Sequence, residues 1–141
     1  MTHMFRALAL CAALGLPLAA QAEETLAEAI TGYMDFATYD SGIIVPEQLD
    51  RTVFEAALFV DTRDAAQFAA GHVPGAVHIE WREVPGRLDE LPDTGMVILY
   101  CNTGSLSAQA AFAARLLGRE NVLVLQTGFD GWQATAAYKP E

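Results

Sequence analysis

The chain has 141 residues with 18 acidic and 8 basic side chains, which gives a formal net charge of −10 at pH 7. An acidic surface repels phosphate backbones, so the composition disfavours nucleic acid as a partner, and the charge is better explained as a means of solubility. The length and the 52% of hydrophobic residues fit one domain whose core buries roughly two-thirds of the surface of the unfolded chain.

The N-terminal segment has the pattern of a secretory signal peptide. Arg6 precedes an apolar run from Ala7 to Ala20, and Ala20-Gln21-Ala22 supplies the small-x-small pattern of a cleavage site. The run is shorter than the roughly 20 residues that span a bilayer, and a glycine and a proline interrupt it, which disfavours an uncleaved membrane anchor. We therefore predict that residues 1–22 are removed, that the mature protein is periplasmic or secreted, and that it has no stable membrane span.

The chain contains two cysteines, Cys11 and Cys101. Because Cys11 falls inside the predicted signal peptide, the mature protein keeps a single thiol, which cannot close an internal disulfide. An odd cysteine in an exported protein is either reactive or paired with another molecule. Cys101 is therefore the first candidate for a functional residue.

Predicted helices and strands alternate along the mature chain. Apolar side chains at helical spacing over residues 25–39 predict a helix, which forms an N-terminal extension over residues 23–42. Strands that alternate with helices predict an α/β fold with a parallel sheet that is covered on both sides. The elements after the extension are predicted as a strand at 43–45, a helix at 46–51, a strand at 58–60, a helix at 64–71, a strand at 76–79, a partly helical stretch at 81–88, a strand at 96–100, a helix at 107–117, a strand at 122–125 and a closing helix at 130–137.

Cys101 lies where the strand at 96–100 ends and an Ala-rich helix follows. In a parallel sheet, sites form beyond the carboxyl ends of the strands. The unpaired N–H groups and the positive dipole end at the start of a helix stabilise a thiolate and lower the pKa of a thiol from its usual value of about 8.5. Cys101 is therefore predicted to be a nucleophile, and the alternative is a buried, inert cysteine.

The residues between Cys101 and the helix favour the first interpretation. Their small and turn-forming side chains allow successive N–H groups to converge on one point as an anion-binding nest. Gly104 suits a positive φ or tight curvature, and Ser107 is a candidate to cap the helix. The hydroxyls of Thr103 and Ser105 are candidates to hydrogen-bond a sulfur anion.

Asp61 and Arg63 follow another strand, the one at 58–60. If the two strands are neighbours, Arg63 brings positive charge close to the thiol, which favours the thiolate or holds an anionic substrate. In the alternative, Arg63 ties down its own loop by pairing with Asp61 or Asp64.

Four segments together carry a family resemblance. In their order and spacing they resemble a single rhodanese domain, which covers residues 43–141. The resemblance implies a five-stranded parallel sheet flanked by helices on both faces, with Cys101 as the sulfur-accepting residue and with no metal or organic cofactor. The four segments are Val60-Asp61-Thr62-Arg63 with Phe68, then Gly71-His72-Val73-Pro74-Gly75-Ala76, then the stretch from Tyr100 to Ala108, and then Gly128-Phe129-Asp130-Gly131-Trp132.

The function that the resemblance implies is sulfur transfer. The Cys101 thiolate takes sulfur from a donor such as thiosulfate, and a thiol or cyanide removes that sulfur from the resulting persulfide. The alternative is a low-turnover module of the same fold that binds a partner or senses redox state. The implied substrate-binding residues are Arg63, Asn102, Thr103, Gly104, Ser105, Leu106 and Ser107, with Asp61 in a supporting role.

Leu106 is the main departure from the family pattern, because many members carry Arg or Lys at its place. Its apolar side chain removes a charge that would bind an anionic donor, so the expected partners are a small-molecule sulfur donor and a thiol acceptor, with a thiol persulfide or a partner protein as an alternative donor. Related phosphatases of this fold use a longer loop that ends in Arg, and no Arg lies between Cys101 and Ser107.

Three other residues are interpreted more conservatively. His72 lies in the Gly-His-Val-Pro-Gly turn, where the resemblance implies a structural role. Trp81 and Arg82 follow the third predicted strand and are candidates to line the pocket, with core packing or surface pairing as the alternative. The histidines and the single mature thiol have no spacing that resembles a zinc site, so no metal is expected.

Overall fold

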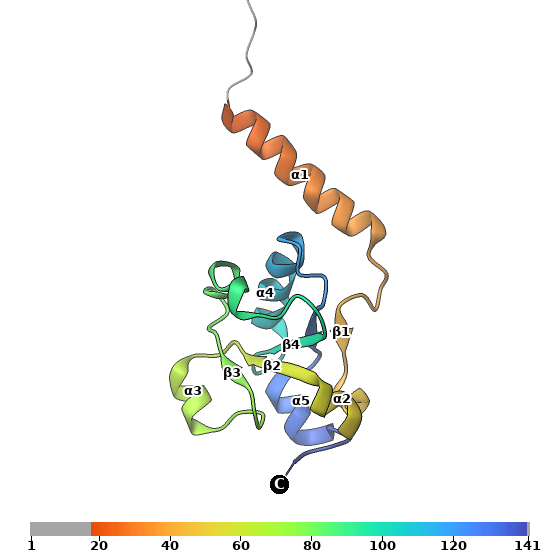
Figure 1. Ribbon diagram of the computed structural model, residues 1–141, viewed down its shortest axis with the longest axis vertical. Helices are drawn as coiled ribbons and strands as arrows, with labels where there is room; N and C mark the ends of the chain where they lie inside the picture. The colour runs from red at the N-terminus through yellow and green to blue at the C-terminus, as the bar shows by residue number, and fades with distance from the viewer. Residues whose placement is uncertain (1–17, 141) are drawn as a thin grey trace, which may run out of the picture. The chain divides into compact units, whose positions relative to one another are not determined.

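The computed structural model describes residues 18–140, and the side chains from Thr25 on (Figure 1). The chain divides into two units, the first ending at Asp35 and the second beginning at Phe36. All but the last residue of the helix α1 (Leu18–Phe36) belongs to the first unit, and this helix starts earlier and ends earlier than the helix predicted over 25–39. Residues 1–17 of the predicted signal peptide lie outside the described residues. Within the described part of the chain, no helix is long and apolar enough to cross a membrane.

The second unit is built on a five-stranded parallel sheet with the strand order β1-β5-β4-β2-β3. All five predicted strands are present, so the predicted α/β fold is confirmed. The sheet is formed by β1 (Ile43–Ile44), β2 (Ala57–Asp61), β3 (Val77–His78), β4 (Met96–Tyr100) and β5 (Val122–Leu125).

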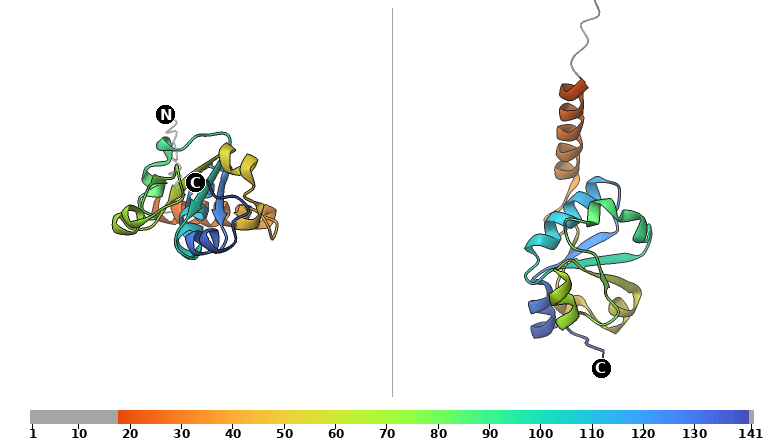
Figure 2. Two further views of the ribbon diagram at one scale, coloured as in Figure 1. Left: turned by 90° about the horizontal axis from the view of Figure 1, so that it is seen from below. Right: turned by 90° about the vertical axis from the view of Figure 1, so that its left-hand side faces the viewer.

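Two hydrophobic cores lie on the two faces of this sheet, and β4 contributes to both. Val97 and Leu99 point into one core, while Ile98 and Tyr100 point into the other, because side chains alternate along a strand. The helices on opposite sides of the sheet are visible in the right-hand view of Figure 2. The helical elements are η1 (Pro46–Gln48), α2 (Arg51–Ala56), α3 (Ala65–Ala70), η2 (Val84–Gly86), η3 (Leu88–Glu90), α4 (Ser105–Leu116) and α5 (Gly128–Thr135).

The first core is closed by α4, whose buried alanines Ala110, Ala111 and Ala114 face the sheet. Their short side chains allow the helix to approach the strands closely. The second core is closed by residues of α2 and α5, among them Phe54 and Trp132. These two layers confirm the predicted cover on both sides of the sheet.

Several predicted helix boundaries differ from the structure, and three helix starts show why. The helix predicted over 46–51 is a single 3₁₀ turn, and a separate helix, α2, begins after Asp50, whose carboxylate accepts a hydrogen bond from the Val53 N–H at 2.9 Å. The helix α4 begins at Ser105 rather than at Ser107, and α5 begins at Gly128 rather than at 130. In each case a local capping or turn contact, rather than the hydrophobic pattern, decides where the helix begins.

The sheet brings two loops together. Strands β2 and β4 are neighbours, and their registers pair Asp61 with Tyr100 at their carboxyl ends. The segment with Arg63 and the segment that starts at Cys101 therefore leave the sheet side by side. The approach of Arg63 to the thiol was expected only if these two strands are neighbours, and they are.

Candidate active site

Cys101 is a free cysteine directly after β4, and only 3% of its surface is exposed. Backbone N–H groups of Thr103, Leu106 and Ser107 lie close enough to its sulfur to lower the pKa of the thiol. The hydroxyl of Ser107 lies 3.6 Å from Sγ and 3.1 Å from the carbonyl oxygen of Gly104, and it can donate its proton to either. The loop thus aims several donors at one sulfur atom.

These donors decide the ionisation of the thiol. Burial alone would raise the pKa of Cys101, because it removes water from the charged form. The hydrogen bonds from Ser107, Thr103 and Leu106 outweigh burial and lower the pKa of Cys101 below its ordinary value. The thiolate is the nucleophilic form of cysteine, so the loop favours the reactive state.

The path of the loop depends on a left-handed residue at the start of α4. Gly104 precedes the helix with φ +95°, a conformation that L side chains rarely adopt. This turn makes Ser105 the first residue of the helix and Ser107 the third, so the prediction that Ser107 caps the helix was wrong. Its buried hydroxyl instead lies beside the sulfur.

The hydroxyls of Thr103 and Ser105 were expected near a sulfur anion. They lie 3.3 Å from each other, on exposed residues, and Thr103 reaches the sulfur through its backbone N–H. Backbone donors therefore take the role that was assigned to these side chains.

The outer side of the loop rests on the start of α5. The N–H of Phe129 donates to the carbonyl oxygen of Cys101 at 2.8 Å, and the N–H of Asp130 donates to that of Asn102 at 3.0 Å. A Cβ on Gly128, where φ is +57°, would lie 2.4 Å from the Cys101 carbonyl oxygen and 2.6 Å from that of Asn102. Only glycine fits there. This close approach was not predicted from the sequence, although Gly128 belongs to one of the four segments that carry the family resemblance.

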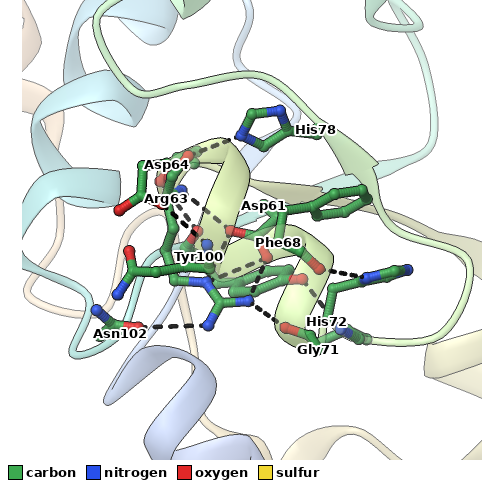
Figure 3. Close-up of polar contacts among 12 residues, drawn as sticks. Asp61, Arg63, Asp64, Phe68, Gly71, His72, His78, Tyr100 and Asn102 are labelled. Carbon is green, nitrogen blue, oxygen red and sulfur yellow. Dashed lines mark hydrogen bonds and ion pairs between the residues drawn. The ribbon is translucent and has the colours of Figure 1, made fainter.

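Arg63 forms the adjoining wall and is almost fully buried. Its guanidinium binds the Asp61 carboxylate through Nε and Nη2, with 2.6 Å between Nη2 and Oδ2, and donates to the Gly71 carbonyl oxygen at 2.7 Å (Figure 3). Nη1 reaches Oδ1 of Asn102 at 3.4 Å, and the guanidinium carbon lies 4.1 Å from the centre of the Phe129 ring. Arg63 thus pairs within its own loop, as in the alternative, and also contacts the residue that follows Cys101.

Two histidines support the Arg63 loop. His72 hydrogen-bonds the Phe68 carbonyl oxygen through Nδ1 at 2.9 Å, and His78 hydrogen-bonds the Arg63 carbonyl oxygen through Nε2 at 2.8 Å (Figure 3). Both rings also stack with the ring of Phe68. These contacts fit the structural role that was expected of His72.

Cys101 opens into a pocket of about 450 Å³. Trp81 and Arg82 line it, and the alternative roles also hold, because Trp81 packs against the first core and Arg82 pairs with Glu80 at 3.0 Å. Leu106 contributes an apolar side chain that is 40% exposed. Four further residues, from the segment after β2 and from the turn directly after β3, were not predicted to line the pocket: Thr62, Asp64, Gln67 and Glu80.

The described residues hold no group of three or more His, Cys, Asp or Glu side chains that could bind a metal ion. The pocket presents the thiol, the amides around it and the charged side chains on its wall.

Comparison with known proteins identifies relatives. The family model of the rhodanese-like domain matches residues 45–135. A sulfurtransferase of Allochromatium vinosum is 35% identical over 78 residues, which cover 55% of this chain and 73% of the relative. The thiosulfate sulfurtransferase GlpE of Pseudomonas putida is 38% identical over 95 residues, which cover 65% of this chain and 84% of the relative.

A solved structure shows the same fold. The human single-domain sulfurtransferase TSTD1 superposes with a TM-score of 0.56 at 22% identity, covering 68% of this chain and 98% of the human one. The family match spans more than half of the chain and includes both loops that meet at the carboxyl ends of β2 and β4, and the chain belongs to the rhodanese-like domain family.

Proposed function

We propose that this protein is a sulfurtransferase that moves sulfane sulfur from a donor to a thiol or cyanide acceptor through a persulfide on Cys101. The observation that carries the proposal is the convergence of three backbone N–H groups and one hydroxyl on the sulfur of a single free thiol beside a pocket. The relatives named as sulfurtransferases support the class of reaction.

In the first half-reaction, the Cys101 thiolate attacks the outer sulfur of a donor such as thiosulfate. A bond forms between Sγ and that sulfur, the S–S bond of the donor breaks, and sulfite leaves with the electron pair. The negative charge stays near one point throughout, where the amides of Thr103, Leu106 and Ser107 already point. Such preformed dipoles stabilise the charge without reorganising during the step.

In the second half-reaction, the acceptor attacks the outer sulfur of the persulfide. The bond between Sγ and that sulfur breaks, and Cys101 leaves as the thiolate, which restores the starting state. Arg63 and Asp61 act here as positioning residues, because they hold the neighbouring loop against Asn102 and Phe129.

The decisive test is the intact mass of the mature protein after incubation with a sulfur donor. We expect a gain of one sulfur atom, and no gain in Cys101→Ser, which keeps the size of the side chain but removes the sulfur. A gain of the same size in Cys101→Ser would place the sulfur elsewhere and contradict the proposal. Formation of thiocyanate from thiosulfate and cyanide, compared between the two proteins, tests the complete cycle.

A second candidate function is a module that binds a partner or senses redox state. The apolar Leu106 on the pocket wall favours it, since this residue offers no charge to a thiosulfate dianion. In that case the mass of the protein would stay unchanged with every donor.

We also propose that the protein acts outside the cytoplasm, on the basis of its N-terminal sequence pattern. Expression of the full chain in a bacterial host is expected to yield a periplasmic protein that begins at Glu23. A cytoplasmic product that keeps residues 1–22 would contradict this proposal.

A further inference from the structure

We propose that the sulfur donor is an organic persulfide with a neutral or cationic body, and that Glu80 is the residue that selects against anionic donors. The inference rests on the proposed sulfur transfer and concerns the charge and size of the substrate. It follows from the pocket residues Glu80, Trp81 and Arg82, which have no part in the proposed reaction steps.

The fixed charges around the pocket do not favour a dianion. The pocket is lined by two arginines, Arg63 and Arg82, and by two carboxylates, Asp64 and Glu80. The carboxylate of Asp61, which pairs with Arg63, brings the formal sum of these charges to −1. Both arginines are also paired, with 2.6 Å between Arg63 and Asp61 and 3.0 Å between Arg82 and Glu80. A thiosulfate ion that approaches Cys101 therefore meets no unpaired cation on this wall.

Glu80 is the carboxylate that pairs with Arg82, the more accessible of the two arginines. Its two oxygens accept hydrogen bonds from the backbone N–H of Arg82 and from Nε at 2.9 to 3.1 Å. Its side chain is 18% exposed, while that of Arg82 is 73% exposed. The hydrogen bonds from Arg82 lower the pKa of Glu80, so the carboxylate is charged at neutral pH.

The size and the lining of the pocket point to an organic molecule. A volume of about 450 Å³ is within the range of roughly 300–1,000 Å³ that holds drug-sized ligands, far more than a small tetrahedral ion fills. Trp81 and Leu106 offer apolar surface next to the thiol. Arg63 and Gln67 also line a neighbouring pocket of about 230 Å³, which gives a longer substrate room to extend.

Transfer of sulfur from such a persulfide to Cys101 needs no further reactant. The Cys101 thiolate attacks the outer sulfur of a persulfide R–S–SH, a bond forms between Sγ and that sulfur, and the S–S bond of the donor breaks. The thiolate R–S⁻ leaves with the electron pair, and Cys101 carries the –SH group. The body R then lies in the pocket against Trp81, Leu106 and the Glu80–Arg82 pair.

The test compares the rates at which donors of matched length but different charge load sulfur onto Cys101. The donors are the persulfides of cysteamine, mercaptoethanol and mercaptoacetate, whose tails are cationic, neutral and anionic, together with thiosulfate. Loading is followed by intact mass at low ionic strength, where charge effects are least screened. In the unchanged protein we expect the rates to fall in the order of these four donors.

Glu80→Gln keeps the shape of the side chain and leaves Arg82 without its carboxylate. We expect this variant to load mercaptoacetate persulfide and thiosulfate about fivefold faster, and cysteamine persulfide slower, since one unit charge near a ligand changes its energy by about 1 kcal/mol in a watery site. Arg82→Gln is expected to shift the same rates in the opposite directions. Glu55→Gln is the matched control, because Glu55 also pairs with an exposed arginine, Arg51, but does not line the pocket.

The outcomes separate the two proposals. Charge-dependent changes in both Glu80→Gln and Arg82→Gln, with none in Glu55→Gln, support the assignment. Loading of Cys101 with equal rate ratios for all four donors in the pocket variants overturns the role of Glu80 while leaving sulfur transfer intact. Failure of every donor to load Cys101 in the unchanged protein instead contradicts the proposed function.

Discussion

The loops that follow β2 and β4 start side by side from the same edge of the sheet but are built in opposite ways. After β2, the charges of Asp61 and Arg63 satisfy each other in a buried pair. After β4, the donors of the loop converge on a thiol whose pKa is lowered by hydrogen bonds. The first loop acts as a frame because the buried charges of Asp61 and Arg63 neutralise each other, and the second is reactive because dipoles stabilise its sulfur anion.

Breaking the frame is expected to have the largest effect. Asp61→Asn leaves the buried guanidinium of Arg63 without its counter-charge, and loss of one partner of a buried pair costs about 3–5 kcal/mol. Urea unfolding measures the loss. Arg51–Glu55 is the exposed counterpart, and Glu55→Gln should leave the unfolding midpoint unchanged. Equal effects of the two variants would show that the Asp61–Arg63 pair does not act as a frame.

The contact between the reactive loop and α5 is the next target. Gly128→Ala places a Cβ against two carbonyl oxygens at a positive φ, and we expect a loss of about 2–4 kcal/mol in unfolding free energy together with slower alkylation of Cys101. Thr127→Gly is the control, since Thr127 has φ +65° and glycine relieves that strain, so it should stabilise by about 1 kcal/mol. An unchanged unfolding free energy in Gly128→Ala would mean that α5 does not hold the loop.

The next variant removes one hydrogen-bond donor to the sulfur of Cys101. Ser107→Ala deletes the hydroxyl beside Sγ and should raise the pKa of Cys101, which slows alkylation by iodoacetamide at neutral pH about tenfold, as for loss of one hydrogen bond to a charged group. The pH profile of alkylation should move to higher pH. Ser105→Ala, whose hydroxyl lies near Thr103, is the matched control and should leave the profile unchanged. A profile that does not move in Ser107→Ala would assign the lowered pKa to the backbone alone.

The same lowered pKa makes stability depend on pH. The folded protein binds fewer protons at Cys101 than the unfolded chain does between the folded pKa and the ordinary pKa of a free thiol. The stabilisation by the thiolate is therefore fully present above the pKa of the unfolded chain, and is lost as the pH falls through the folded pKa. Unfolding free energies of the unchanged protein, relative to Cys101→Ser, should rise with pH across this window, and a flat difference would contradict the shift.

The smallest effect is expected from a cation placed at position 106. Leu106→Arg adds an unpaired charge to the pocket wall, and we expect thiosulfate to load sulfur onto Cys101 about threefold faster. Leu106→Gln, which adds polarity without charge, is the control. Slower or unchanged loading in Leu106→Arg would show that charge at this position does not limit the reaction with thiosulfate.

Much of the fold was predictable, because it depends on local patterns. The apolar runs at 58–60, 96–100 and 122–125 identify strands through their hydrophobicity alone, and the turns around them separate the helices. The starts of α4 and α5 were predicted two residues late, since the left-handed Gly104 and the contacts of Phe129 and Asp130 with the loop decide them. Boundaries of this kind depend on single dihedral angles and on partners from elsewhere in the chain.

By itself the sequence determined the parallel α/β fold, the position of Cys101 between a strand and a helix, and the family motifs, because each is written in consecutive residues. Only the tertiary structure decided that Ser107 faces the sulfur, that Gly128 closes the loop from outside, and that Arg63 is paired with Asp61. It also placed Glu80 on the wall of the pocket. These contacts join segments that lie far apart in the chain or depend on the exact path of the backbone, and spacing along the sequence carries no record of which side chains meet across a sheet.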